Sequence, residues 1–278
     1  MTQDARPTTH DALIAFDFET TGLYPIKDKI VEIGAVRFNA GDGTVIDTFN
    51  SFVNPGIPIP QVVINIHGIT DEMVKNAPYE KDAMLSFLDY IGDAPLMAHN
   101  VSFDVGFLMA AVSIYKIKPP ANLLIDSCEL SRMCFKNVEN HKLSTLGKSL
   151  NIEQSGYHRA LADAVVVMKL YNMCLERLEN KMTVQDIASR TTSGLKFSDY
   201  VFDKIELPDD KIGLKQAIDK GQSVGIKYRN NKGDESQREI TPFNIYSFLG
   251  KTYVSAYCHH CSEDRQFRLD RIYEVSIK

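Results

Sequence analysis

The sequence predicts a mixed α/β sheet flanked by helices, followed by a small β-rich module. Three strand-like runs open the chain, and from residue 78 onward short strands alternate with helical patterns. From residue 212 the pattern changes to short alternating strands. The charge changes there too, because residues 209–278 hold 12 Lys and Arg against 10 Asp and Glu, whereas the whole chain carries a net charge of −5. Two unlike segments fit two domains better than one.

The opening segment is predicted to be an antiparallel meander. Residues 12–18 form a compact apolar run that is typical of a buried strand. Residues 29–38 and 44–53 alternate well enough to be two further strands, and the run NAGDG at residues 39–43 predicts a tight turn between them.

Helices and strands alternate in the next part of the chain. Pro55, Pro58 and Pro60 interrupt regular structure, and residues 70–72 indicate a helix start. The periodicity then predicts helices over residues 78–91, 101–115, 143–150 and 159–178, and strands over residues 95–99 and 123–126.

The last third of the chain divides into a linker and a module. Residues 181–208 are polar and mixed, which predicts a linker with room for a helix near residues 184–190. A short helix over residues 214–220 and several short strands follow, with breaks at residues 230–233, 248–250 and 259–264. The predicted domains are therefore residues 1–180 and 209–278, joined by residues 181–208.

Composition excludes several classes of protein. The longest apolar runs, such as residues 13–16 and 165–168, are far too short to span a bilayer, and residues 1–11 lack the apolar core of a secretory signal. Five scattered cysteines argue against a disulfide framework, so a reducing cytoplasm and no membrane association are expected. The negative net charge argues against coating nucleic acid through bulk charge, but metal ions can offset an acidic active site.

Two carboxylates lie two residues apart on the first predicted strand. Because a strand has a period of two, Asp17 and Glu19 project from the same face. Adjacent anions at the end of a buried strand repel each other and raise each other's pKa unless a cation lies between them. Hard divalent ions prefer such oxygen ligands, although an isolated Asp-x-Glu more often marks a solvated strand end.

Two further carboxylates follow at helix starts. Asp104 falls at a strand-to-helix junction, and Asp163 lies among apolar residues near the start of the long predicted helix, five residues after His158. Each alone is explained by the preference of a helix N-terminus for negative charge. The acidic set becomes informative only when its members are taken together.

Three ordered motifs resemble those of the DEDDh-type exonucleases, a family that includes the proofreading subunit of bacterial replicative polymerase. They are FDFETTGL at residues 16–23, HNVSFDVGFL at residues 99–108 and HRALADA at residues 158–164. Lesser marks are KIVEIGAV at residues 29–36 and HGIT at residues 67–70. The resemblance spans roughly residues 10–178, and three spaced motifs are far more specific than any one of them.

The resemblance implies a ribonuclease-H-like fold and hydrolysis of terminal phosphodiesters, which releases nucleoside 5′-monophosphates from a 3′ end. The substrate would be single-stranded or 3′-ended DNA, or RNA. It also implies two Mg²⁺ or Mn²⁺ ions, with His158 as general base, since an imidazole can accept a proton near neutral pH. The implied metal ligands, which also count as catalytic residues, are Asp17, Glu19, Asp104 and Asp163.

Substrate contacts are implied by the same motifs. Thr20, Thr21 and Leu23 match family positions that border the terminal nucleotide. Phe103 either stacks on a base or packs in the core. His99 and Asn100 are also counted among the substrate contacts, and for these two residues shaping the turn between strand and helix is favoured over binding metal.

The C-terminal module resembles a WYL domain in four runs, at residues 226–229, 237–242, 252–258 and 265–272. It departs from the family at residues 252–254, which read TYV where the family usually has WYL. The resemblance implies a small Sm-like β-barrel that binds nucleic acid or a nucleotide-like ligand. The side chains implied for stacking and phosphate contacts are Tyr228, Arg238, Tyr253, Arg265, Arg268 and Arg271.

Simpler roles compete for some of these residues. Tyr253 and Phe267 could be core side chains, and Arg268 and Arg271 could pair with nearby carboxylates. The run CHHC at residues 258–261 suggests zinc, but four consecutive residues cannot all wrap one tetrahedral ion, so a hairpin tip is favoured.

The leading hypothesis is a DNA exonuclease whose C-terminal module binds or senses nucleic acid, and three alternative hypotheses remain. An RNA exonuclease of the same motif class differs only in a few pocket contacts to the 2′-hydroxyl. A non-catalytic binding protein is disfavoured by the intact acidic set. A polymerase-bound proofreading subunit is disfavoured because residues 180–208 contain no clear clamp-binding peptide, which leaves a stand-alone repair or processing nuclease as the preferred reading.

Overall fold

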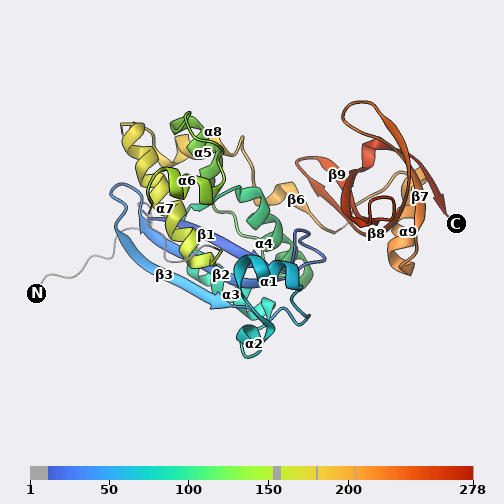
Figure 1. Cartoon of the computed structure of the whole chain (residues 1–278), viewed down its shortest axis with the longest axis horizontal. Coiled ribbons are helices and arrows are strands. Elements are labelled where there is room, and N and C mark those ends of the chain that lie inside the picture. Colours follow the sequence, from blue (N-terminus) through green and yellow to red (C-terminus); the bar gives the residue numbers. More distant parts are fainter. Residues whose placement is uncertain (1–11, 153–157, 180, 204, 278) are drawn as a thin grey trace, which may run out of the picture. The chain divides into compact units, whose positions relative to one another are not determined.

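The computed structural model describes residues 12–152, 158–179, 181–203 and 205–277. These residues form two compact units, with the boundary between Phe197 and Ser198 (Figure 1). Residues 1–11, in which no export signal is predicted, lie outside the described residues. The predicted linker of residues 181–208 is thus divided between the two units.

The first unit is built on a five-stranded mixed sheet with the strand order β3-β2-β1-β4-β5. The first three strands are antiparallel neighbours, whereas β4 and β5 run parallel to β1. The sheet confirms the predicted mixed α/β architecture. Its strands are β1 (Ala12–Thr20), β2 (Ile30–Asn39), β3 (Val45–Phe52), β4 (Leu96–Ala98) and β5 (Leu124–Asp126).

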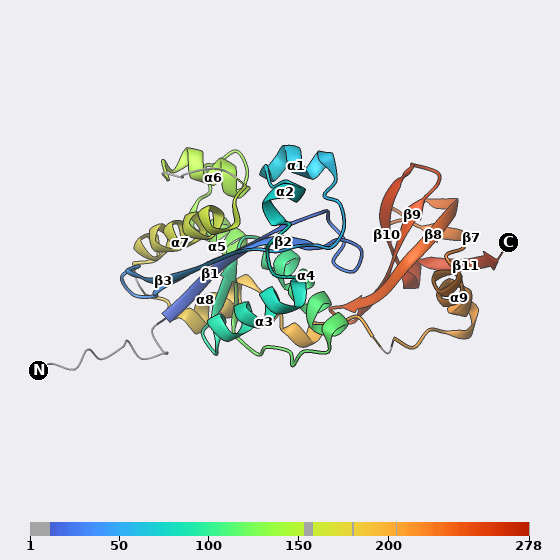
Figure 2. The ribbon, with the colours of Figure 1, turned by 90° about the horizontal axis from the view of Figure 1, so that it is seen from below.

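Helices cover both faces of this sheet (Figure 2). Helix α7 packs on β1 and β2, α3 packs on β2 and β3, and α4 packs on β4 and β5. The described helices of this unit are α1 (Gln61–His67), α2 (Asp71–Val74), α3 (Glu80–Ile91), α4 (Val101–Tyr115), α5 (Ser127–Cys134), α6 (Leu143–Ser149), α7 (Ala160–Arg177) and α8 (Val184–Thr191).

The central strand β1 is buried on both faces, which explains why its sequence is a nearly continuous apolar run. Leu13 and Ala15 belong to the core beneath α7. Phe16 and Phe18 point the other way, and their rings lie 5.7 and 5.5 Å from the ring of Phe87 on α3. Because side chains alternate between the two faces of a strand, residues 17 and 19 lie on the same face as Leu13 and Ala15, which is the face that α7 covers.

Part of the predicted linker forms helix α8, which packs against the first unit. Ile187 and Ala188 are buried in the core beneath α7. The Thr191 hydroxyl accepts a hydrogen bond from the backbone N–H of Asp126 at the end of β5, at 3.2 Å. The segment therefore contributes to the first unit, although its composition is polar.

Two helices escaped prediction. Helix α1 begins directly after Pro60. The prolines are interpreted from the sequence only as breaks in regular structure, although a proline is also well tolerated at the start of a helix. Helix α5 has only eight residues, which is too short for its apolar spacing to distinguish a helix from a loop in the sequence.

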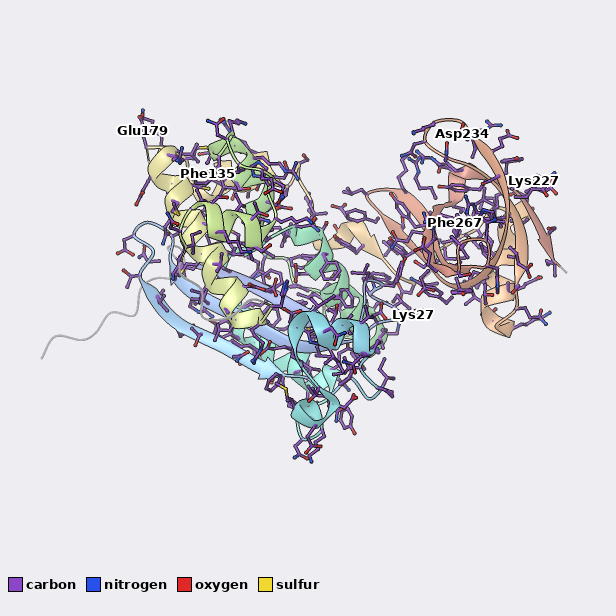
Figure 3. The ribbon with its side chains drawn as sticks, viewed as in Figure 1. Lys27, Phe135, Glu179, Lys227, Asp234 and Phe267 are labelled. Atoms are coloured by element: carbon purple, nitrogen blue, oxygen red, sulfur yellow. The ribbon has the colours of Figure 1, made fainter. Side chains whose placement is uncertain are left out.

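The second unit is a curved antiparallel sheet around its own small core, and it confirms the predicted β-rich module. Phe267 is buried in this core, whereas Asp234 is exposed in the turn between β7 and β8 (Figure 3). The strand order is β10-β9-β8-β7-β11, and β6 pairs with β8. The elements are β6 (Tyr200–Val201), α9 (Ile212–Lys220), β7 (Val224–Arg229), β8 (Glu235–Phe248), β9 (Lys251–Cys258), β10 (Glu263–Arg268) and β11 (Ile272–Ile277).

Among the described residues, no helix has the length and apolar character needed to cross a membrane.

Candidate active site

The carboxyl-terminal end of β1 presents Asp17 and Glu19 on the α7 face of the sheet. Both side chains are half-buried. In the β1–β2 ladder, Asp17 lies opposite Gly34, and Glu19 lies opposite Glu32. The two carboxylates therefore project over a part of the sheet where the neighbouring strand offers a glycine and a third acidic side chain.

Asp104 reaches the same strand end from another element. It lies in the first turn of α4 and is buried, and its Oδ1 accepts a hydrogen bond from the backbone N–H of Phe18 at 3.0 Å. Phe18 stands between Asp17 and Glu19 in the chain. The contact fixes the start of α4 beside the paired carboxylates.

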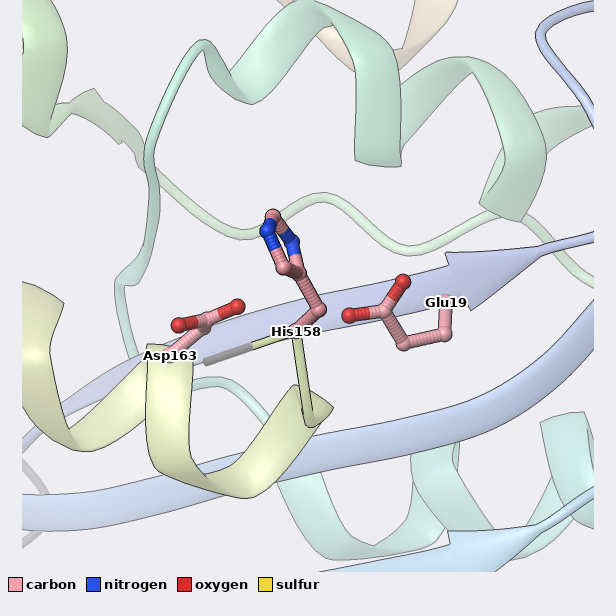
Figure 4. Close-up of side chains that lie close together, drawn as sticks. All are labelled: Glu19, His158 and Asp163. Atoms are coloured by element: carbon pink, nitrogen blue, oxygen red, sulfur yellow. The ribbon is translucent and has the colours of Figure 1, made fainter. Parts of the chain in front are cut away.

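The start of α7 completes the cluster. One ligand atom from each of Glu19, His158 and Asp163 lies within 4.8 Å of the others (Figure 4). In the described parts of the chain, this is the one group of three or more such side chains that are close enough to share a metal ion. His158 is exposed, so its imidazole can reach a bound substrate.

The electrostatics of the cluster connect all four predicted carboxylates. Burial raises the pKa of Asp17 well above its ordinary value, and Asp104, Glu19 and Asp163 raise it further by charge repulsion. Burial also raises the pKa of Glu19 to about 8, with further contributions from Asp163 and Glu32. The cluster therefore resists its own ionisation, and divalent cations coordinated by oxygen would offset this cost.

Metal-free protein is expected to lose stability as pH rises, because Glu19 and Asp104 both have pKa values of about 8 in the fold, against ordinary values of 4.5 and 3.8. The folded state then binds more protons than the unfolded chain between about pH 4 and about pH 8. The stabilisation is complete below that window and disappears as pH rises through it. Thermal unfolding in EDTA should show a falling melting temperature, and Mg²⁺ should raise it more at about pH 8 than at about pH 5.

The variant Asp104→Asn is the matched control, because it keeps an acceptor for the Phe18 N–H and removes one buried charge. Its melting temperature should depend less on pH. A wild type that becomes more stable toward pH 8 without metal would contradict this account of the cluster.

The hydroxyls of two predicted substrate residues are used inside the protein. Thr20 Oγ1 donates to the carbonyl of Gly22 at 2.6 Å, and Thr21 Oγ1 accepts from the backbone N–H of Lys29 at 2.9 Å. Both hydroxyls therefore stabilise the turn after β1. Leu23 is 71% exposed and is the member of the predicted trio whose side chain is open to a ligand.

Both ring nitrogens of His99 are used in contacts within the protein, and its contact with the substrate stays a prediction. Its Nε2 donates to the carbonyl of His141 at 2.7 Å, and its Nδ1 accepts from the Ser127 hydroxyl at 2.9 Å. Burial lowers the pKa of His99 to about 4, so the ring is neutral and both nitrogens are used. The alternative expectation, that His99 shapes the turn, fits these contacts.

The other two residues of the second motif remain accessible. Asn100 is exposed and adopts a left-handed conformation, with φ of 65°, immediately before α4. Phe103 is half-buried, and its ring centroid lies 5.1 Å from that of Phe107 on the next turn. Phe103 therefore packs along α4, with part of its ring exposed.

Asp126 is a structural residue that sequence reasoning missed. Its carboxylate accepts from the N–H of Cys128 at 2.8 Å, which caps α5. It also accepts from the N–H groups of Asn100 and Val101 at 3.2 Å each, at the start of α4. An Asp directly before the run SCEL is a recognisable helix N-cap signal, but the second helix it holds could not be read from sequence.

Three of the six predicted C-terminal residues meet at one pocket. Tyr228, Arg238 and Arg265 come from β7, β8 and β10 and line a cavity of about 360 Å³. Tyr228 also contacts the core, with its ring 5.2 Å from Phe267 in an edge-to-face arrangement. The pocket thus combines two guanidinium groups with an aromatic ring.

The other three predicted residues do not line this pocket. Tyr253 stacks on Tyr246 across the β8–β9 ladder, with ring centroids 5.4 Å apart. Arg268 forms an ion pair with Asp270, as the simpler expectation had it, and Arg271 is half-buried. Residues 259–262 form the turn between β9 and β10, so CHHC lies at a hairpin tip as favoured.

A mixed sheet in this strand order, with carboxylates from β1, α4 and α7 near the end of β1, is a ribonuclease-H-like arrangement of the kind found in nucleases. The chain belongs to the Exonuclease (RNase_T) family, whose profile matches residues 14–171. The WYL domain family matches residues 213–277. The two predicted resemblances are confirmed.

Curated relatives include the PolC-type DNA polymerase III of Oceanobacillus iheyensis, which is 39% identical over 171 residues. That match covers 62% of this chain and 12% of the polymerase. The PolC-type enzyme of Bacillus subtilis is 38% identical, with coverage of 60% and 12%. The chain thus spans only a small part of the length of these relatives.

Solved structures share the fold at lower identity. Exonuclease X in complex with 5′ overhanging duplex DNA has a TM-score of 0.51 at 24% identity, over 64% of this chain and 97% of that one. The nuclease domain of 3′hExo, a DEDDh family member bound to rAMP, has a TM-score of 0.51 at 20% identity, over 64% and 96%. Exonuclease I reaches 0.56 at 15% identity, over 89% and 55%. The ribonuclease-H-like fold is therefore confirmed.

Proposed function

We propose that this protein is a metal-dependent 3′→5′ exonuclease that hydrolyses terminal phosphodiesters of DNA and releases nucleoside 5′-monophosphates. The observation that carries the proposal is the convergence of Glu19, His158 and Asp163 within 4.8 Å of one another, beside two further carboxylates. A cluster with this mixture of carboxylates and an accessible imidazole suits hydrolysis of a phosphodiester.

The side chains fit a pair of divalent cations. All four predicted ligands offer carboxylate oxygen, and the pKa values of Asp17, Glu19 and Asp104 are raised, as expected of a site that is completed by positive charge. Mg²⁺ or Mn²⁺, when bound, would neutralise charge on the scissile phosphate and make water a stronger nucleophile. The proposed ligands are Asp17, Glu19, Asp104 and Asp163.

His158 is the proposed general base. Its exposed ring lies at the start of α7, beside Glu19 and Asp163, where it can accept the proton of the attacking water. Leu23, exposed just beyond the end of β1, would pack against the terminal nucleotide. The accessible side chains of Asn100 and Phe103 are the remaining proposed substrate contacts.

DNA is the proposed substrate, and RNA is the alternative. The relatives at 38–39% identity are DNA polymerases, and one structural neighbour holds duplex DNA. A 3′-exonuclease that recognises a histone mRNA stem-loop shares the fold at 18% identity. A cytoplasmic, stand-alone role in repair or processing remains part of the proposal.

The second unit is proposed to bind the nucleic acid strand. Its pocket holds Arg238 and Arg265, whose guanidinium groups suit phosphate, and Tyr228, whose ring suits a base. Two acidic side chains, Asp234 and Glu235, line the same pocket and would limit how many phosphates it accepts.

A time course on end-labelled single-stranded and duplex DNA, and on matched RNA, tests the proposed function. With Mg²⁺ or Mn²⁺, mononucleotides should be released stepwise from the 3′ end of DNA, and EDTA should stop the release until metal is restored. Cleavage that continues in EDTA, or internal cuts, would refute the proposal. RNA degradation at equal or greater rate would favour the alternative substrate.

The same assay tests the second unit. Replacing both Arg238 and Arg265 by Met should raise KM for long strands several-fold and leave the rate on very short ones unchanged. Lys220→Met is the control, because Lys220 is exposed at the end of α9 and is not among the residues that line the pocket. Equal behaviour of the two variants would argue against the pocket.

A further inference from the structure

A fifth carboxylate, Glu32, lies at the candidate site without belonging to the proposed metal ligands. It is 1% exposed and faces Glu19 across the β1–β2 ladder. Its two oxygens accept three hydrogen bonds from the chain at the start of α7. A buried charge needs such partners, because burial without them costs several kcal/mol.

Two of these hydrogen bonds come from one guanidinium group. Arg159 Nη2 donates to Glu32 Oε1 at 2.8 Å, and Arg159 Nε donates to Glu32 Oε2 at 3.1 Å. The guanidinium also lies over the ring of Phe52 on β3, 5.2 Å from its centroid. A bidentate pair with a ring beneath it fixes the direction of the side chain as well as its charge.

The third hydrogen bond holds the helix backbone. The N–H of Ala160, the first residue of α7, donates to Glu32 Oε2 at 3.0 Å. Gly34, two residues further along β2, allows the close approach, because a Cβ there would lie 2.0 Å from the backbone nitrogen of Leu161. Strand β2 therefore contacts three consecutive residues, 159–161, through the hydrogen bonds of Glu32 and the close approach at Gly34.

His158 directly precedes residues 159–161, which β2 holds in place. Its backbone has φ of 58°, a left-handed conformation that a non-glycine residue adopts at an energetic cost. Its side chain is exposed, so little packing holds the imidazole itself. Anchors on the following residues are the means by which the fold can keep the ring beside Glu19 and Asp163.

From this geometry we propose that Arg159 and Glu32 are positioning residues, which hold the His158 imidazole where it accepts a proton from the attacking water. The inference rests on the proposed function. The hydrogen bonds of Arg159 described above go to Glu32 and not to a proposed metal ligand, so its proposed effect passes through its neighbour in the chain, His158. Its loss should therefore lower kcat without changing KM.

The conservative variant Arg159→Lys tests this role. Lysine keeps a positive charge beside buried Glu32, so the protein should fold, but it cannot form the two-pronged contact. Loss of a supporting contact of this kind typically costs about 10–100-fold in activity. We expect kcat to fall within this range, with KM for a short DNA strand unchanged.

A double-mutant cycle with His158→Ala separates positioning from other roles. If Arg159 acts through the imidazole, Arg159→Lys should cost less than about twofold once His158 is absent, because residues that act as one unit are not additive. An equal loss in both backgrounds would show that Arg159 supports the helix and Asp163 generally. A raised KM would show direct contact with phosphate, and either result overturns the inference.

Arg37→Lys is the matched control. Arg37 also lies on β2, pairs with a carboxylate of the sheet, Asp47, and lies over a ring, with its guanidinium 4.8 Å from the centroid of Tyr90. It should change neither kcat nor KM. A wild type that shortens no strand with Mg²⁺ or Mn²⁺ would refute the proposed function itself, and the inference with it.

Discussion

Replacing Asp17 by Asn is expected to lower exonuclease kcat by roughly a thousandfold or more, since a bound metal contributes several kcal/mol and each 1.4 kcal/mol is tenfold in rate. Asp17 is the carboxylate on which the charges of Asp104, Glu19 and Asp163 all act. Asparagine has nearly the same shape but cannot supply the negative charge. The measurement is single-turnover release of mononucleotide from a short DNA strand.

The fold should survive this substitution. The change removes a half-buried carboxyl group whose ionisation its acidic neighbours oppose, so the melting temperature of metal-free protein should stay equal or rise. Asp42→Asn is the control, because Asp42 is exposed in the turn between β2 and β3. Wild-type turnover in the Asp17 variant would remove that residue from the metal site.

Replacing Gly34 by Ala is expected to disturb both stability and catalysis. The added methyl group would lie 2.0 Å from the backbone nitrogen of Leu161 and 2.2 Å from the carbonyl carbon of Ala160. Backbone atoms cannot rotate away as a side chain can, so the start of α7 must move. Overpacking of this kind costs about 1–3 kcal/mol, and a displacement of about 1 Å at catalytic groups can cost about a hundredfold in rate.

The free energy of unfolding, measured in denaturant, and kcat should therefore both be lower for Gly34→Ala than for the wild type. Gly147→Ala is the matched control, because Gly147 lies within helix α6 and an added Cβ meets no described atom within 4 Å. Alanine should leave that helix equal or more stable. A Gly34 variant with wild-type stability and rate would show that the start of α7 does not lie as close to Gly34 as described.

Much of the candidate site was readable from the chain. The period of a strand predicts that Asp17 and Glu19 share a face, and the ladder bears this out. His158 and Asp163 meet Glu19 as the ordered motifs predict. The first prediction follows from the geometry of one strand, whereas the second rests on the family resemblance, because no local rule brings β1 and α7 together.

The parts that sequence could not supply are contacts between distant segments. Glu32 and Arg159 are 127 residues apart, and nothing in either run marks them as partners. His99 belongs to a motif, yet its role is set by the carbonyl of His141 and the hydroxyl of Ser127. Helix α8 joins the first unit because two apolar side chains fill its core, which the polar average of residues 181–208 conceals.

The central claim is that carboxylates from β1, α4 and α7 hold a pair of divalent cations. Counting the Mn²⁺ ions bound per chain, by the loss of the free-ion paramagnetic resonance signal with a nucleoside 5′-monophosphate present, tests it most directly. Wild-type protein should bind two ions tightly, and the Asp17→Asn variant should bind fewer. No tight binding by the wild type, or equal binding by both proteins, would contradict the account.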